Sequence, residues 1–452
     1  MTSWRKKAAA AVSTLAIALS LVAVPSTQAD GIPGSGFNTS FRIQNTSTSA
    51  ANCTYDIYSN TGGSAVFSQT IAAIAADDSY LVYTGAVAGF PAGTNAGVVS
   101  CDAEVSVVVA FANTTQSDAY LGTSAPANTM YVPITYKNYF NFSSSLRIQN
   151  ASSTAQNITL TYYEGSVTPV TTQNFALTGN GSVTVDQATI AALGNNKSYS
   201  VKIEGTQPLA VNVVVFGLTG TSADKQTLSY SGFSGGSTIV YTPIVLKNYY
   251  GYNSSTTIQN VGNAPATVVQ TYSNGTIANH TIAPNASKVV LDYQNAALPT
   301  GNAAGSFSAK LTSNQPIIVV VNEGNNLARA SSYEGMNAGT TKVVAPSVVK
   351  SYYGYNSSIQ CQNVSAVAST VTVSYKGGAV NLVNQPVSNN LAPNASALIY
   401  LPSNASLPNN WAGSAVVNSS QPLVCVVSQD QNTAPNNTQV KDTFAVYDGI
   451  NK

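Results

Sequence analysis

A Gln-Asn pair set in a run of small polar residues recurs along the chain, and this repeat constrains the fold more than any other feature. The pairs begin at Gln44, Gln149, Gln259 and Gln362, so consecutive copies lie 105, 110 and 103 residues apart. Spacings of this length match a whole β-sandwich domain and exceed the repeats of solenoid proteins. The sequence therefore predicts four tandem units of similar structure.

The segments between the Gln-Asn pairs carry strand and turn signals. Each pair is followed by alternating β-branched residues that end in Tyr and a turn, as in "TVVQTYSNG" and "TVTVSYKGG". Alternation that ends in Asn-Gly or Gly-Gly is typical of β-hairpins. Later in units two to four a Gln-Pro introduces an apolar strand, whereas unit one has "EVSVVVAF" at that place. The pattern predicts an all-β protein of immunoglobulin-like sandwiches, each with about seven strands.

The expected boundaries follow from the repeat and from the N-terminal segment. Residues 1–29 have the basic start, apolar stretch and small-residue cleavage site of a secretory signal peptide, with an uncleaved membrane anchor as the alternative. The four units are expected at residues 30–130, 131–238, 239–341 and 342–452. "TIAALGNN" and "QNAALP" resemble helix but are too short for more than a turn. We expect a secreted protein, extracellular or at the cell surface.

The charge balance excludes several classes of partner. Only 8% of the 452 residues are charged, and the formal net charge is +1. This balance gives no electrostatic basis for binding nucleic acid or an anionic membrane. No later segment is long and apolar enough for a transmembrane helix.

Four cysteines in an exported chain predict two disulfides. Pairing inside single units would join Cys53 to Cys101 and Cys361 to Cys425, and buried free thiols are the alternative. A zinc site is disfavoured because no C-x-x-C occurs and the chain has a single histidine. We expect neither metal nor cofactor.

An aromatic phrase precedes the Gln-Asn pair in units two to four, at "KNYFNF", "KNYYGY" and "KSYYGY". It is expected to form a turn at the junction between units, with aromatic rings that pack one sandwich against its neighbour. The alternative is a stacking platform for sugar rings. The residues concerned are Tyr139, Phe140, Phe142, Tyr249, Tyr250, Tyr252, Tyr352, Tyr353 and Tyr355.

Candidate catalytic groups are few, and we expect no enzyme. His280 lies on a strand after a hairpin and is expected at the surface, so no Ser-His-acid set can be assembled. Asp77 and Asp78 are expected to form a turn, with calcium binding as a weak alternative. Asn285 and Asn394 are the most favourable of the N-x-S/T sequons for glycosylation because they lie in turns.

The unit "YYGYNSS…IQN…VTVSY…APNAS…GSAVV…QPLVCVV" resembles the β-sandwich repeat of uncharacterised secreted surface proteins of filamentous and mat-forming bacteria. The resemblance covers nearly all of the chain after residue 29, is weaker in unit one, and implies extracellular display without a catalytic motif. We expect a structural or adhesive protein that self-associates or coats a surface, as in a fibre, sheath or S-layer. An array of carbohydrate-binding modules that contacts cell-surface polysaccharide is the alternative.

One further expectation concerns the strand that introduces each unit. Units two, three and four have such a junction strand, whereas unit one begins almost directly at "GFNTSFRIQN". One terminal sandwich would then present an open sheet edge, which favours pairing with another chain. We expect a head-to-tail contact that gives open filaments, with residues 30–35 as the segment that could reach across.

Overall fold

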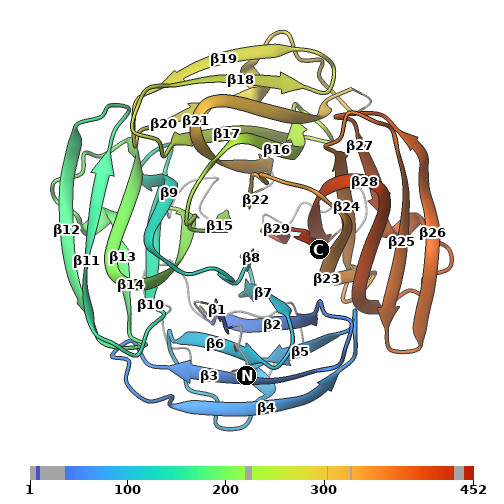
Figure 1. Ribbon diagram of the computed structural model, residues 1–452, viewed down its shortest axis with the longest axis horizontal. Coiled ribbons are helices and arrows are strands. Elements are labelled where there is room, and N and C mark those ends of the chain that lie inside the picture. The colour runs from blue at the N-terminus through green and yellow to red at the C-terminus, as the bar shows by residue number, and fades with distance from the viewer. Residues whose placement is uncertain (1–6, 11–35, 219–225, 303, 326–327, 432–441) are drawn as a thin grey trace, which may run out of the picture.

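A computed structural model of the chain is a closed ring of four β-sandwiches around a central axis (Figure 1). It describes residues 7–10, 36–218, 226–302, 304–325, 328–431 and 442–452. The all-β expectation is confirmed, because the described elements are strands and four 3-10 turns of three residues each. Most of the predicted signal peptide, residues 1–29, lies outside the described residues.

The elements repeat from unit to unit. Unit 1 comprises β1 (Lys7–Ala10), β2 (Asn38–Asn45), β3 (Ala51–Tyr58), β4 (Phe67–Ile74), β5 (Ser79–Tyr83), η1 (Thr84–Ala86), β6 (Ala96–Cys101), β7 (Val105–Ala112) and β8 (Ser117–Leu121). Unit 2 comprises β9 (Ala127–Lys137), β10 (Phe142–Asn150), β11 (Gln156–Tyr163), β12 (Pro169–Leu177), β13 (Ser182–Asp186), η2 (Gln187–Thr189), β14 (Lys197–Gly217) and β15 (Thr227–Ser231). Unit 3 comprises β16 (Ser237–Leu246), β17 (Tyr252–Asn260), β18 (Ala266–Tyr272), β19 (Ile277–Ile282), β20 (Ser287–Val290), η3 (Asp292–Gln294), β21 (Ser306–Asn325) and β22 (Ala330–Glu334). Unit 4 comprises β23 (Thr340–Lys350), β24 (Tyr355–Asn363), β25 (Ser369–Gly377), β26 (Val380–Leu391), β27 (Ser396–Tyr400), η4 (Leu401–Ser403), β28 (Trp411–Gln431), β29 (Phe444–Asp448) and β30 (Ile450–Asn451).

Each sandwich has two antiparallel layers, and unit 1 displays them as separate sheets. One layer has the order β1-β6-β3-β4 and the other the order β5-β2-β7-β8. In unit 2 the single strand β14 serves both layers: its first half pairs with β9 and β11, and its second half with β10 and β15. The Gln207-Pro208 pair lies between these halves, where the register to β9 shifts. Proline suits this bend because it cannot donate to a regular ladder.

The Asn of each repeated Gln-Asn pair is a structural residue. Asn260 is fully buried, and its Nδ2 donates to the carbonyl oxygens of Ala264 at 2.8 Å and Ile282 at 3.0 Å. Its Oδ1 accepts from the Gly262 N–H at 2.9 Å. Buried backbone groups need such partners. The same two donor bonds recur at Asn45, Asn150 and Asn363.

The ring closes around the four inner strands β8, β15, β22 and β29 (Figure 1). Each inner strand has a buried Tyr at its fourth position, and Tyr230, Tyr333 and Tyr447 donate to a carbonyl of the junction strand of their own unit. The hydrophobic cores extend across the boundaries between neighbouring units. The core of unit 3, for example, includes Val426 and Val446 of unit 4.

Units 1 and 4 meet inside the chain, so the head-to-tail contact expected between molecules is made within one molecule. The core of unit 4 includes Val108, Ala110 and Ala119 of unit 1. The Asp442 N–H also donates to Thr115 O at 2.8 Å. The expected filament therefore loses its docking surface, because the two ends of the array already cover each other.

The expected open edge of unit 1 is also filled in this structure. Lys7–Ala10 pairs with β6 antiparallel, from Lys7 opposite Ser100 to Ala10 opposite Gly97. This is the place that β9, β16 and β23 take in the other units. The two disulfides join Cys53 to Cys101 and Cys361 to Cys425, each between neighbouring strands of one sheet.

Candidate functional site

The lysine that begins the aromatic phrase of units 2, 3 and 4 has a structural role. The Lys247 ammonium donates to the carbonyl oxygens of Asn295 at 2.7 Å and Leu298 at 2.9 Å, which closes the loop after η3. Lys350 does the same at Asn404 and Leu407, and Lys137 reaches Ile190 O. In the described part of the chain, these lysines bind carbonyl oxygens and form no ion pair with a carboxylate. They replace water at buried carbonyl groups.

The aromatic residues that follow form narrow hairpin turns. The Tyr249 N–H donates to Tyr252 O at 3.0 Å, and the Tyr252 N–H returns the bond at 2.9 Å. The two residues between them, Tyr250 and Gly251, have φ angles of 48° and 83°. Two successive positive φ angles are characteristic of a type I′ turn, which prefers Asn-Gly. An aromatic ring at the first position is therefore locally unfavourable.

This unfavourable choice recurs at equivalent turns. Phe140 has φ 48° and Tyr353 has φ 49°. Their side chains are 68% and 43% exposed, and that of Tyr250 is 65% exposed. Each ring stands edge-on to the preceding Tyr, with centroids 4.6 to 4.9 Å apart. We call Phe140, Tyr250 and Tyr353 the turn-tip aromatics.

The turn-tip aromatics lie on one face of the ring. Each turn adjoins the end of the long strand that leads to the inner strand, since Phe142 pairs with Gly217, Tyr252 with Asn325 and Tyr355 with Gln431. The inner strands meet level with one another. The Ser231 N–H at the fifth position of β15 donates to the Glu334 carboxylate at the fifth position of β22. The Val446 N–H at the third position of β29 donates to the Ser331 hydroxyl at the second position of β22. Repetition around the ring therefore places the three turns at the same end of the axis.

The flanking aromatics of the phrase pack inward and toward neighbouring units. Tyr252 of unit 3 contacts Phe444 of unit 4 with ring centroids 5.0 Å apart, and its hydroxyl donates to Asp430 at 3.2 Å. Tyr355 is buried. Tyr139 stacks on Tyr136 at 5.5 Å. Tyr139, Phe142, Tyr249 and Tyr352 are half-buried.

Amide side chains lie next to two of the turn-tip aromatics. The Tyr250 N–H donates to Asn302 Oδ1 at 2.8 Å, and the Asn248 N–H donates to Asn253 Oδ1. Beside Phe140, Asn138 Nδ2 donates to Asn195 Oδ1. This combination of exposed ring and neutral amide suits an uncharged ligand that presents C–H faces and hydroxyl groups.

His280 is buried, so the expectation of a surface histidine is wrong. Its Nε2 lies 3.2 Å from Gln270 Oε1, and Gln270 Nε2 donates to Asp292 Oδ1 at 3.2 Å. Asp292 also accepts from Tyr272 and Thr256. Burial lowers the pKa of His280 to about 4 and raises that of Asp292 to about 6. All of these side chains are at most 7% exposed, so the network stabilises the sandwich interior and has no access to a substrate.

Carboxyl groups also lie buried at the axis. Asp442 accepts from the backbone N–H groups of Thr227 in unit 2 and Ala330 in unit 3, at 2.7 and 3.2 Å. Asp118 of unit 1 accepts from the Ser331 hydroxyl. Burial raises the pKa of both carboxyls well above the usual range, and the Asp118 charge raises the pKa of Asp442 further. Asp442 connects the units and is closed to solvent.

Two shallow pockets lie away from these groups. One of them, of about 230 Å³, is lined mainly by residues of unit 3, among them Met336 and Asn337, and also by Phe233 of unit 2 and Asn451 of unit 4. The smaller is lined by Arg147 and Thr94 among others. In the described ranges, no cluster of three or more His, Cys, Asp or Glu could hold a metal ion. No helix of this part of the chain is long and apolar enough to cross a bilayer.

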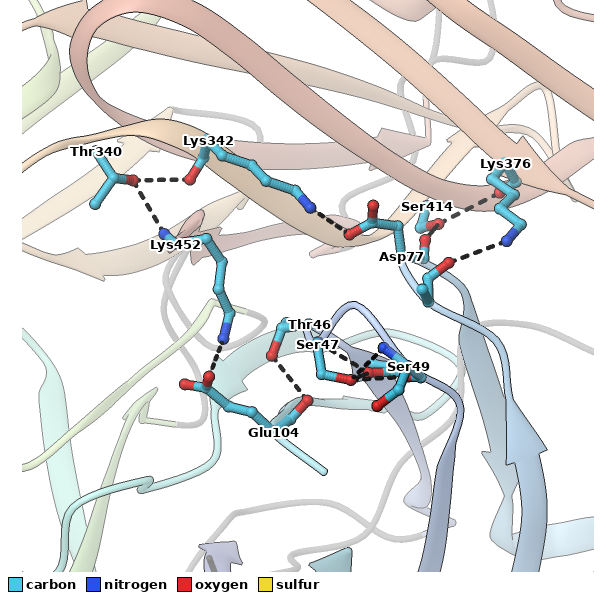
Figure 2. Close-up of polar contacts among 12 residues, drawn as sticks. Thr46, Ser47, Ser49, Asp77, Glu104, Thr340, Lys342, Lys376, Ser414 and Lys452 are labelled. Atoms are coloured by element: carbon cyan, nitrogen blue, oxygen red, sulfur yellow. Dashed lines mark hydrogen bonds and ion pairs between the residues drawn. The ribbon is translucent and has the colours of Figure 1, made fainter. Parts of the chain in front are cut away.

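The turn expected at Asp77 and Asp78 and the two sequon turns have one role: each docks on the neighbouring unit. Asn285 O accepts from the Ser200 hydroxyl of unit 2 at 2.7 Å, and Asn394 O accepts from that of Ser308 in unit 3 at 2.6 Å. Asp77 Oδ1 lies 2.6 Å from Lys342 Nζ of unit 4 (Figure 2). Asn285 is half-buried and Asn394 exposed.

Comparisons with known proteins do not assign the chain to a family. No protein-family model and no curated protein matches the chain. A Thermotoga maritima structure titled "Crystal Structure of Thermotoga maritima 1070" is 15% identical, with a TM-score of 0.22, over 24% of this chain and 94% of that chain. A tetra-tandem repeat in the extending region of a large adhesion protein is 14% identical, with a TM-score of 0.12, over 90% of this chain and 94% of that chain. Scores this low carry no argument about function.

Proposed function

We propose that the protein is an extracellular, non-enzymatic adhesive or coat protein whose aromatic face binds a neutral surface polysaccharide. The observation that carries this proposal is the recurrence of an exposed aromatic residue at a turn position that favours Asn or Gly. Backbone strain of this kind persists where the surrounding structure holds it, often at ligand contacts. Here the three exposed turn-tip aromatics, with φ angles of 48° to 49°, share one face of the ring.

The chemistry of the face supports a neutral polymer over a charged one. Aromatic rings stack on the C–H faces of sugars, and the adjacent amides offer donors and acceptors to hydroxyl groups. Three sites on one ring also suit a polymer that repeats, because simultaneous contacts raise the overall affinity. The two disulfides are compatible with an oxidising, extracellular location.

Self-association through the same face is the second candidate, and exposed aromatic surface favours it as well. The two candidates differ in what they need. If the face binds polysaccharide, the monomeric protein is retained on an insoluble glucan or chitin matrix. If the face self-associates, the average molar mass of the protein in solution rises with its concentration.

The test is a triple variant, Phe140→Asn, Tyr250→Asn and Tyr353→Asn. Asn tolerates positive φ, so the turns keep their geometry and the sandwiches stay folded. If each ring contributes about 1 kcal/mol, retention on the polysaccharide should fall about a hundredfold. The matched control is Tyr80→Asn with Tyr400→Asn, which removes two exposed rings from β5 and β27. Equal retention of the triple variant and the wild type would overturn the proposal.

A further inference from the structure

Unit 1 differs from the other units in how its junction-strand position is filled. In units 2, 3 and 4 the strands β9, β16 and β23 extend over 11, 10 and 11 residues. Each pairs along the first half of the long strand and on to its second half, at Leu209, Ile317 and Leu423. In unit 1 the paired segment is Lys7–Ala10, four residues long.

The strand register shows which side chains occupy the junction-strand position in each unit. Met130 pairs with Ile203 and Val132 with Val201, and both β9 side chains are fully buried. At the matching positions of unit 1, Val99 pairs with Ala8 and Gly97 with Ala10. Units 3 and 4 place Val240 and Val343 where unit 2 places Met130. The position is therefore built for a longer strand with larger apolar residues at alternate positions.

The four residues that fill the position belong to the segment expected to be removed as a signal peptide. Loss of residues 1–29 would free the edge of β6 from Gly97 to Ser100 and uncover the side of Val99 that faces it. The edge itself would persist, because Cys101 at the end of β6 is bonded to Cys53 of β3. An exposed edge over an apolar core accepts a strand from another chain.

We propose that, in the exported protein, unit 1 binds an extended segment of a different polypeptide, which pairs antiparallel with β6 and completes the sandwich. The required segment has apolar residues at alternate positions, as in "MYVPI" of unit 2. A second copy of this chain is a poor donor. Its segments outside the described residues and beyond residue 29 are polar and rich in Gly, Asn, Ser and Thr, as in "DGIPGS", "TGTSADK" and "NTAPNNTQVK". The proposal rests on export under the proposed function, but it does not involve the aromatic face.

The first experiment determines the N-terminus of the protein recovered from the culture medium by intact mass. That protein is then titrated with a labelled peptide of residues 127–137, "ANTMYVPITYK". We expect saturable binding to the exported form and no binding to the full chain, whose position is filled. Retention of residues 1–29 in the exported form, or absence of peptide binding, overturns the proposal.

Peptide variants test the orientation without risk to the fold of the protein. Met130→Asp or Val132→Asp in the peptide places a charge in the core and should reduce affinity at least tenfold. Thr129→Asp or Tyr131→Asp changes half-buried outer positions and should reduce it less. Equal losses from the two sets would contradict strand addition.

A cross-link tests the register. Lys202 pairs with Tyr131 in unit 2, and Val98 is its equivalent on β6. The Val98→Cys protein should form a disulfide with a Tyr131→Cys peptide, and the Ser100→Cys protein should form it at least tenfold more slowly. Cross-linking at the same rate would exclude the proposed register. Peptide binding is scored independently of polysaccharide retention, so either proposal can fail alone.

Discussion

Lys342 of the last unit and Asp77 of the first form an ion pair with Nζ and Oδ1 2.6 Å apart (Figure 2). Asp77 has a φ of 57°, and the equivalent turn residues Asn180, Asn285 and Asn394 have φ angles of 59° to 60°. Every one of these turns docks on a neighbouring unit, but only the turn that closes the ring is acidic. At the joint between the two ends of the array, the Ser414 hydroxyl still donates to Asp77 O at 3.3 Å, as at the other joints, and the charge pair is added to this neutral hydrogen bond.

Asp77→Asn should convert the closing turn to the type found at the other joints. Both partners are about one-third exposed, so the ion pair should contribute no more than about 1 kcal/mol to the free energy of unfolding. Asn keeps the positive φ. Urea unfolding at low and high salt measures the effect. A loss above about 2 kcal/mol would mean that ring closure depends on this pair.

Asp77→Val is the companion variant, and it should destabilise more. A β-branched residue is strongly disfavoured at positive φ, at a cost of about 1–3 kcal/mol. Both variants delete the ion pair, so the salt-dependent part of the loss should be the same in both, and only the additional loss of Asp77→Val should be insensitive to salt. Equal losses from the two variants would contradict the assignment of strain to this turn.

Asn260→Ala should be among the costliest single changes in unit 3. It deletes two buried donor bonds and one acceptor bond, and it leaves the Ala264 and Ile282 carbonyls without this partner. We expect a loss of about 2–4 kcal/mol in the free energy of unfolding. Asn279→Ala, at an exposed position of β19, is the matched control and should change stability by less than about 0.5 kcal/mol. Similar effects of the two variants would contradict the role of the buried amide.

Local patterns were sufficient for the units but not for the ring. The Gln-Asn repeat and the turn signals predicted tandem sandwiches because they report on strands that are close in sequence. Ring closure depends on residues such as Val108 and Val426, which face a neighbouring unit. Both are valines in apolar strands. A strand that its own domain buries on both faces has the same apolar sequence pattern, so the pattern does not show that a neighbouring unit covers these residues.

His280 shows a signal in the sequence that could have been used. Ala278, His280 and Ile282 alternate along β19, and Ile282 is buried, so the period of two places His280 on the inner face. The expectation of a surface histidine rested on its place on a strand after a hairpin, which does not distinguish the two faces of that strand. The repeat predicts that the aromatic phrase has a role, but it does not distinguish the aromatic residues within the phrase. The positive φ angles of the structure distinguish the exposed turn-tip aromatics from their packed neighbours.

Loss of the disulfide between Cys361 and Cys425 should destabilise unit 4. The cysteines are 64 residues apart, so the chain-entropy model gives about 4 kcal/mol for the double variant Cys361→Ala with Cys425→Ala. Non-reducing peptide mapping should show Cys361 linked to Cys425 and Cys53 to Cys101. A linkage between the first and last units would contradict the structure.

The buried network of unit 3 predicts opposing pH effects on stability. The pKa of Asp292 is raised to about 6 in the folded protein. Its contribution to the free energy of unfolding is therefore fully present at pH values below the pKa of this group in the unfolded chain, and it is lost as pH rises through about 6. The pKa of His280 is lowered to about 4, so its contribution is present above its unfolded value and is lost as pH falls toward about 4. Between pH 4 and 6 the two slopes oppose each other. Asp292→Asn should therefore make stability rise more steeply with pH in this range, and His280→Gln should make it fall. Urea midpoints at half-unit pH intervals measure both slopes, and unchanged slopes in both variants would show that neither group titrates as its burial requires.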